Sequence, residues 1–161
     1  MPPAVSDLFK RTHMGKIYYR LKENGAVSRE VRRMTDNNDI IRLLLPSEHF
    51  SRQLIRLAIY LVASRMDFDL SQLEDLRIAV DEASNYAVIH SPENTTLHVE
   101  IEPSKEYLEI ILTSQLAENG ESRSVMPDSF SRMIMESVVD GFDLQRDKST
   151  CRISLRKRCP D

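Results

Sequence analysis

Hydrophobic residues recur at helical spacing over residues 70–90, LSQLEDLRIAVDEASNYAVIH. This spacing predicts one long amphipathic helix with a single buried stripe. The stripe consists of Leu73, Leu76, Val80, Ala83 and Ala87. Glu82 lies at the edge of the stripe, with Asn85 and Tyr86 about one turn further on and within its reach. A carboxylate in this place is either a hydrogen-bonded structural group or a functional one, and the helix pattern leaves both interpretations open.

A second apolar stretch, residues 47–66, predicts a helix with an unusually wide hydrophobic face. Ser47 is a suitable N-cap, and Pro46 ends the short β-rich run 39–45 before it. The predicted core stripe is Phe50, Leu54, Leu57, Ala58 and Leu61, widened by Ile55, Ile59 and Val62. A helix this apolar is usually covered on two sides. We expect the sheet on one side, and the N-terminal arm or a partner on the other.

Apolar and polar residues alternate in residues 97–102, and in the second run Leu108, Ile110 and Leu112 alternate with Glu109 and Thr113. Residues 103–106 form a turn signal between the two runs. Such alternation predicts an antiparallel hairpin with one buried and one wet face.

The C-terminal third begins with a polar loop over residues 115–127. Asp128 is the expected N-cap of a helix over 129–140, which is followed by strands over 142–146 and 150–158. The inward residues of this helix are expected to be Phe130, Met133, Ile134 and Val138. The order of elements predicts an α/β fold of the α+β type. It is a two-layer sandwich in which an open mixed or antiparallel sheet has helices on one face.

Charge divides the chain unevenly. Residues 1–38 carry eight Lys/Arg and four Asp/Glu, whereas the whole chain has a net charge of −3. We interpret 1–38 as a basic helical arm and linker, 39–158 as the folded domain and 159–161 as a tail. The arm is either a solvated helix face or a basic patch for an acidic partner. The acidic remainder gives no reason to expect direct binding of nucleic acid.

The two cysteines, Cys151 and Cys159, come without a signal peptide, which indicates free thiols and a cytoplasmic protein. Cys151 is expected in the core, on the inner side of the last strand. No apolar run approaches the ~20 residues of a membrane span. The four histidines are widely spaced and the chain has only four glycines, so the sequence contains no zinc motif, nucleophile elbow or P-loop.

Residues 75–90, DLRIAVDEASNYAVIH, resemble the conserved helix of the GHKL ATPase superfamily, and most closely that of its bacterial anti-sigma-factor serine kinases. Residues 129–140, SFSRMIMESVVD, resemble the family's helix after the second glycine box. The resemblance covers roughly residues 39–158. It implies the two-layer sandwich already predicted, and it implies ATP and Mg²⁺ as the family's ligands.

The resemblance assigns the family's motif positions to residues of this chain. Glu82 matches the motif glutamate that acts as a base and orients water, and it is the catalytic candidate. Tyr86 stands where the family has its magnesium-binding asparagine, while Asn85 is one position early, about 100° around the helix. Glu82 and Asn85 are therefore the candidate nucleotide-binding residues, with Asn85 the only candidate metal ligand. His90 matches the family histidine that follows.

Both glycine boxes are replaced. The first falls on Ser114, Leu116 and Glu118, so the aspartate that reads adenine is missing. The second falls on residues 129–131, Ser-Phe-Ser, whose side chains obstruct a close approach of backbone to phosphate. A base without a metal and a phosphate cradle cannot drive phosphoryl transfer, because that chemistry depends on positioning and charge neutralisation.

Three functions follow as hypotheses. The first is a partner-switching regulator that resembles an anti-sigma factor, binds a sigma factor or an antagonist protein, and has weakened or lost ATP binding. The second is an active serine protein kinase of the same family, and the third is a non-catalytic interaction module whose basic arm docks on an acidic surface. Proteins of the family that this chain resembles are often homodimers, so a dimer is expected by analogy.

Overall fold

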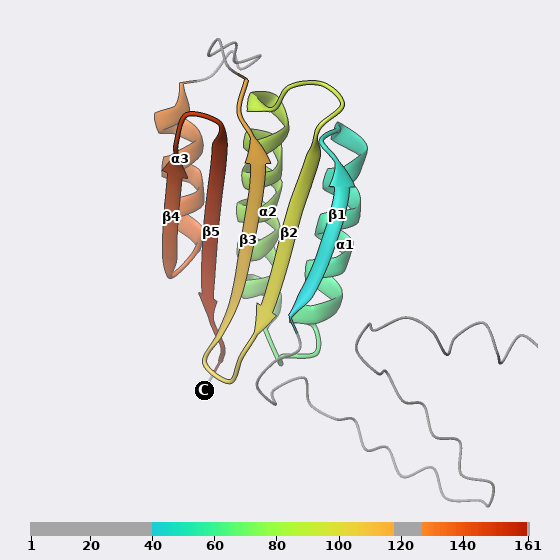
Figure 1. Ribbon diagram of the computed structural model, residues 1–161. Helices are drawn as coiled ribbons and strands as arrows, with labels where there is room; N and C mark the ends of the chain where they lie inside the picture. Colours follow the sequence, from blue (N-terminus) through green and yellow to red (C-terminus); the bar gives the residue numbers. More distant parts are fainter. Residues whose placement is uncertain (1–39, 118–126, 161) are drawn as a thin grey trace, which may run out of the picture. The chain divides into compact units, whose positions relative to one another are not determined.

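The computed structural model describes residues 40–117 and 127–160, which form a layer of strands and a layer of helices (Figure 1). The strands are β1 (Ile41–Pro46), β2 (Thr96–Pro103), β3 (Tyr107–Gln115), β4 (Gly141–Arg146) and β5 (Thr150–Arg158). The helices are α1 (His49–Ala63), α2 (Leu70–His90) and α3 (Asp128–Val138). The predicted arm and most of the predicted polar loop lie outside the described residues.

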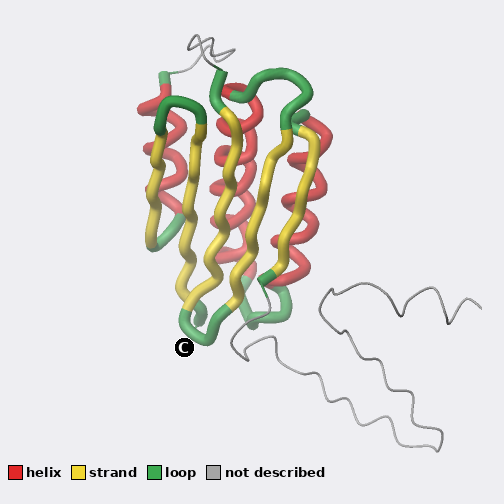
Figure 2. The backbone as a smooth tube through the Cα atoms, viewed as in Figure 1, coloured by secondary structure: helices red, strands yellow, loops and turns green. Residues whose placement is uncertain are grey.

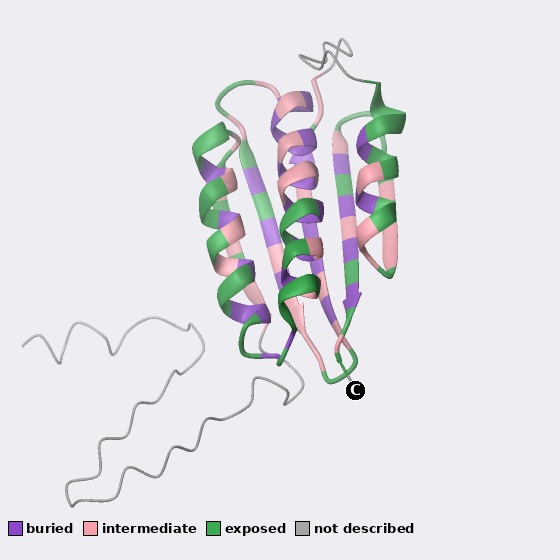
Figure 3. Ribbon diagram, turned by 180° about the vertical axis from the view of Figure 1, so that it is seen from behind, coloured by how far each residue is buried: buried purple, intermediate pink, exposed green. Residues whose placement is uncertain are grey.

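The five strands form one sheet in the order β1-β2-β3-β5-β4, and every neighbouring pair is antiparallel. The sheet is thus antiparallel rather than mixed. All three described helices cover the same face (Figure 2). Seen from behind, α2 lies between α1 and α3 (Figure 3). The predicted α+β two-layer sandwich with helices on one face is confirmed.

The core lies between these layers, and the alternation of the strands decides which side chains enter it. The inward residues of the three central strands are at most 1% exposed: Leu97, Val99 and Ile101; Leu108, Ile110 and Leu112; Cys151, Ile153 and Leu155. The predicted stripe of α2 is also buried throughout. On the opposite face, ion pairs such as Arg42–Glu100 (2.7 Å) join neighbouring strands. The predictions for the hairpin, the α2 stripe and Cys151 are therefore confirmed.

The predicted core face of α1 is wrong. The buried side chains of this helix are Ser51, Ile55, Ile59, Val62 and Ala63. Four residues of the predicted stripe are instead exposed, namely Phe50 (65%), Leu54 (40%), Leu57 (66%) and Leu61 (57%). We call these four residues the α1 stripe. The two apolar faces differ by a rotation of one residue, about 100°. The face that packs against the sheet is the one that carries the β-branched residues Ile55, Ile59 and Val62.

The predicted helix caps are wrong as well. The N-cap position of α1 is Glu48, which makes no side-chain cap, and the Oγ of Ser47 is buried with no hydrogen-bond partner in the described part of the chain. Pro127 is the N-cap of α3, so Asp128 is its first helical residue. Sequence reasoning missed the capping box of α2, in which Asp69 and Gln72 exchange hydrogen bonds.

The predicted inner face of α3 is partly wrong. Phe130 and Met133 are 41% and 57% exposed, whereas Met135 is fully buried and Ser131 is 8% exposed. Met135 enters the core because it lies one turn beyond Ser131, on the side of α3 that faces α2 and the sheet. A short amphipathic helix at the edge of the layer thus buries a narrower face than its sequence predicts.

Candidate functional site

Glu82 lies half-buried on α2, and no hydrogen bond or ion pair joins its carboxylate to the described residues. Arg77, which lies on the same helix, pairs with Glu74 at 2.7 Å and lies 3.9 Å from Asp81. This arginine is therefore engaged with other carboxylates than that of Glu82.

Asn85 takes part in the contact between α1 and α2. Its Oδ1 accepts a hydrogen bond from Nη1 of Arg52 at 3.1 Å. Asp81, one turn earlier on α2, accepts a hydrogen bond from Nε of Arg56 on α1 at 2.8 Å. The side-chain oxygen of Asn85 is the atom that would ligate a cation, and it already accepts a hydrogen bond from the guanidinium of Arg52.

The described residues offer no alternative metal site. Within 40–117 and 127–160, no group of three or more His, Cys, Asp or Glu side chains is arranged to hold a metal ion. A magnesium ion is bound through one or two carboxylates together with substrate phosphates and waters. Glu82 and Asn85 do not fit that pattern, because the Asn85 oxygen accepts a hydrogen bond from Arg52 and Glu82 belongs to no metal-holding group of the described residues.

Tyr86, at the position of the family's metal-binding asparagine, is 2% exposed and belongs to a polar network. Its hydroxyl donates to Oδ2 of Asp128 at 3.1 Å and accepts from Nη1 of Arg146 at 2.9 Å. Arg146 also donates to the same carboxylate oxygen at 2.6 Å. The pKa of Tyr86 is raised to about 12, chiefly by burial; Arg146 opposes the rise and Asp128 adds to it.

His90 completes the network from one turn further along α2. It is 5% exposed, with Nδ1 2.8 Å from the carbonyl oxygen of Tyr86 and Nε2 3.2 Å from Oδ1 of Asp128. Its ring stacks on that of Tyr86 with a centroid distance of 4.1 Å. We call Tyr86, His90, Asp128 and Arg146 the Tyr86 cluster. It joins α2, α3 and β4, and sequence reasoning missed it.

The positions of the first glycine box lie close to this cluster. Ser114 is 3% exposed, and its Oγ has no hydrogen-bond partner among the described residues. It is paired in register with Cys151, whose pKa is raised to about 11, chiefly by burial. The amide of Leu116 donates to Ser149 at 2.8 Å, which ties the backbone there to the β4–β5 turn. Glu118 lies outside the described residues.

The positions of the second glycine box belong to α3. Ser129, Phe130 and Ser131 occupy its first turns, and the amide of Phe130 donates to the carbonyl oxygen of Pro127 at 2.9 Å. The segment is therefore regular helix from its second residue on. A glycine-rich phosphate loop requires backbone freed from such bonds and unobstructed by side chains.

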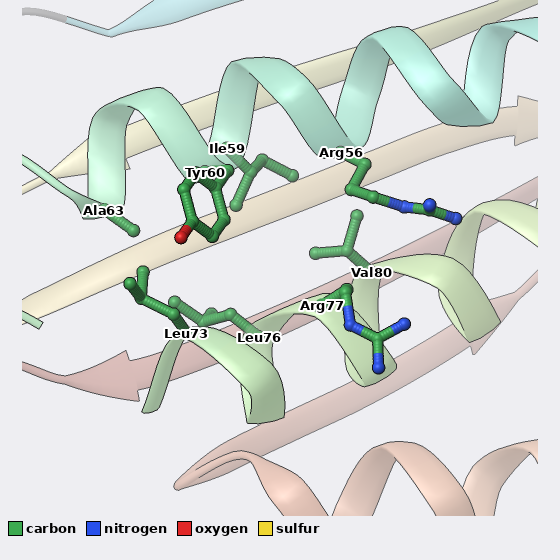
Figure 4. A pocket seen from close by; sticks show the side chains of 8 residues that line it. All are labelled: Arg56, Ile59, Tyr60, Ala63, Leu73, Leu76, Arg77 and Val80. Atoms are coloured by element: carbon green, nitrogen blue, oxygen red, sulfur yellow. The ribbon is translucent and has the colours of Figure 1, made fainter. Parts of the chain in front are cut away.

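Two hollows lie beside α1. A very small one, about 10 Å³, separates the apolar side chains of α1 and α2, with Arg56 and Arg77 near one end (Figure 4). It has room for about one water molecule. An open cleft of about 460 Å³ lies at the N-terminal end of α1. Its lining is Ser47, Glu48, His49, Phe50, Val88, Ser91, Pro92, Glu93 and Asn94. Neither hollow is lined by Glu82, Asn85 or Tyr86.

Comparison with known proteins agrees with this fold. No family model matches the chain. The serine-protein kinase RsbW of Bacillus subtilis is 34% identical over 92 residues, which are 55% of this chain and 55% of the relative. The chain is a partial homologue of RsbW. It spans about half the length of that protein.

A solved structure with the same fold contains the RsbU and RsbW domains of a Mycobacterium tuberculosis protein. It matches with a TM-score of 0.60 at 12% identity, covering 76% of this chain and 33% of the other. The resemblance to the anti-sigma-factor serine kinases is therefore confirmed at the level of an RsbW-like homologue and its fold. None of the described helices is long and apolar enough to cross a bilayer.

Proposed function

We propose that this chain is a cytoplasmic partner-switching regulator of the anti-sigma type, whose ATP binding is weakened or lost. Its partners are a sigma factor, an antagonist protein, or both. The observation that carries the proposal is the environment of Tyr86, which the family resemblance places at the metal-binding position. Where the family has an asparagine that binds magnesium, this chain has a phenol that is bonded to Asp128 and Arg146.

The chemistry of Tyr86 supports the loss of nucleotide binding. With a pKa of about 12, its hydroxyl stays protonated at neutral pH and is a poor ligand for a hard cation. Removing the side chain from the Tyr86 cluster would break two hydrogen bonds of a buried residue. Asn85 is a poor substitute, because its Oδ1 accepts a hydrogen bond from the positively charged Arg52, which would repel a cation bound at the same oxygen.

Isothermal titration with ATP and Mg²⁺ tests this proposal. We expect no saturable, metal-dependent heat up to about 1 mM ATP, which corresponds to a binding free energy weaker than about −4 kcal/mol. Two single variants serve as a matched pair, Glu82→Ala at the candidate site and Glu74→Ala on the exposed side of α2, where Glu74 pairs with Arg77. Tight metal-dependent binding that is lost only in Glu82→Ala would overturn the proposal.

The α1 stripe is the surface that we assign to contacts between copies of the chain. It is an uninterrupted row of apolar side chains on an exposed helix face, and no charged residue lies within it. Two such rows related by a two-fold axis bring apolar side chains together without opposing like charges. A homodimer is also what the family resemblance implies.

Partner binding is tested by measuring the affinity of the chain for candidate sigma factors and antagonist proteins with and without Mg-ATP. We expect binding of at least one partner with the same affinity in both conditions. An affinity that rises several-fold on addition of Mg-ATP would show that nucleotide still controls the complex, which contradicts the proposed loss.

An active serine kinase is the second candidate function. It is favoured by Glu82, a retained motif glutamate whose carboxylate has no partner in the described part of the chain. Incubation with radiolabelled ATP and an antagonist protein distinguishes the two candidates. Label transferred to a serine of the antagonist, and abolished by Glu82→Gln, would favour the kinase; absence of transfer is expected here.

A further inference from the structure

The carboxylate of Asp128 is contacted by polar side chains from two other elements, α2 and β4. Oδ1 faces Nε2 of His90 at 3.2 Å, and Oδ2 accepts from the Tyr86 hydroxyl at 3.1 Å and from Arg146 at 2.6 Å. Charge-assisted bonds of this kind are stronger than neutral ones. Both oxygens of one carboxylate are thus held by groups whose arrangement suits an oxyanion.

The side chains around Asp128 are themselves held in place without it. Nδ1 of His90 lies 2.8 Å from the Tyr86 carbonyl oxygen, which can only accept a hydrogen bond, so Nδ1 carries a proton and Nε2 donates to an oxyanion when the ring is an imidazolium. Arg146 donates to the Tyr86 hydroxyl at 2.9 Å, and its guanidinium lies 5.8 Å from the centre of the tyrosine ring. The positions of the Tyr86, His90 and Arg146 side chains therefore have support besides Asp128 itself.

Solvent reaches this arrangement. The side chains of Asp128 and Arg146 are 48% and 36% exposed, whereas His90 forms the closed inner end at 4%. Asp128 is also the first residue of α3, where no side chain caps the helix. The partial positive charge at a helix start adds to the attraction for an anion. An ion of phosphate size could enter from outside if the carboxylate were absent.

We propose that Tyr86, His90 and Arg146 form a binding site for a small oxyanion, phosphate in chemical class, which the chain fills with its own Asp128 carboxylate. A tethered group has an effective concentration of millimolar or more, so it outcompetes phosphate at ordinary concentrations. The inference deepens the proposed function and rests on it, because a self-filled anion site beside α3 is one reason for weak binding of a nucleotide.

The test replaces Asp128 and supplies inorganic phosphate instead. Wild type, Asp128→Ala and the matched control Asp143→Ala are unfolded with urea in about 50 mM phosphate and in sodium chloride of equal ionic strength. Asp143 is a suitable control because it is a strand aspartate whose carboxylate accepts a hydrogen bond from Gln145 and has no other partner among the described residues. We expect phosphate to stabilise Asp128→Ala alone, shifting its folding equilibrium about tenfold if Kd is about 5 mM.

Two further variants make the result decisive. In Asp128→Ala combined with Arg146→Ala the response to phosphate should disappear, because the main cationic donor is gone. If Asp128→Ala does not fold, Asp128→Ser removes the carboxylate, keeps a small polar side chain at the start of α3, and is titrated with phosphate by NMR.

Equal responses of Asp128→Ala and Asp143→Ala would overturn the inference, as would a response that persists without Arg146. For the serine variant, the absence of saturable shifts at His90 would do the same. None of these measurements contains nucleotide. Failure of the anion site is thus distinguishable from failure of the proposed function, which depends on titration of the wild type with Mg-ATP.

Discussion

Leu57→Ala is the sharpest perturbation of the α1 stripe. Leu57 is 66% exposed and lies near the middle of the helix, so its side chain contributes little to the core of the subunit. A homodimer built on the α1 stripe would bury it. The substitution should therefore weaken the dimer while the subunit remains folded.

The magnitude follows from the exposed fraction. Full burial of a leucine side chain contributes about 1.5–3 kcal/mol, so burial of the exposed two-thirds contributes about 1–2 kcal/mol. A two-fold interface contains the residue twice, which gives about 2–4 kcal/mol. The dimer dissociation constant should rise by about 30-fold or more, since 1.4 kcal/mol is a factor of ten. Alanine favours helix, so unfolding of the monomer should change by less than about 0.5 kcal/mol.

Sedimentation equilibrium over a range of protein concentrations measures the dissociation constant, and urea unfolding below that concentration measures the monomer. Leu70→Ala is the matched control, because Leu70 is a leucine with 78% exposure at the start of α2, outside the α1 stripe. Equal dimerisation of the two variants would refute the reasoning. So would a wild type that is monomeric throughout, or a Leu57→Ala monomer destabilised by about 2 kcal/mol or more.

Three further predictions concern α2. The pKa of Tyr86 is raised from 10.0 to about 12, so its stabilising contribution is complete below pH about 10 and is lost as pH rises from about 10 to about 12. Tyr86→Phe should therefore lose less stability than wild type between about pH 9 and pH 12 in urea titrations. Asp75→Ala removes the 2.8 Å partner of the buried Lys157 ammonium and should cost about 2 kcal/mol, whereas Asp75→Asn should cost less. Asp69→Ala breaks the capping box and should cost about 1 kcal/mol, while Asp69→Ser should retain most of the stability; equal losses would contradict the role of the cap.

The fold was predictable where one face of an element is clearly apolar. The α2 stripe and the inward residues of the hairpin have a single hydrophobic period, so only one orientation buries them. In α1 both Leu57 and Ile59 belong to apolar rows, and the helical period fits either of them equally well. The choice between two such rows depends on the shape of the sheet surface, which local sequence does not contain.

The candidate site was only partly predictable. The i, i+4 spacing of Tyr86 and His90 placed both on one side of α2. Asp128 and Arg146, however, lie 42 and 60 residues from Tyr86, and only the strand order brings β4 and α3 to that side of α2. Asp128 was assigned to helix capping because residue type and position favour an N-cap, while Pro127 occupies that position in the structure.

The two sides of α2 differ in a way that bears on how a partner switch would operate. Toward α1, Asn85 and Asp81 pair with arginines; toward α3, the Tyr86 cluster and the Lys157–Asp75 ion pair fix the neighbouring elements. Both seams are thus closed by the chain's own side chains, and α3 needs no nucleotide to be held. A ligand shifts an equilibrium only by its differential affinity for the two states. On the proposed function, the choice between partners would therefore be decided by their relative affinities and concentrations rather than by ATP.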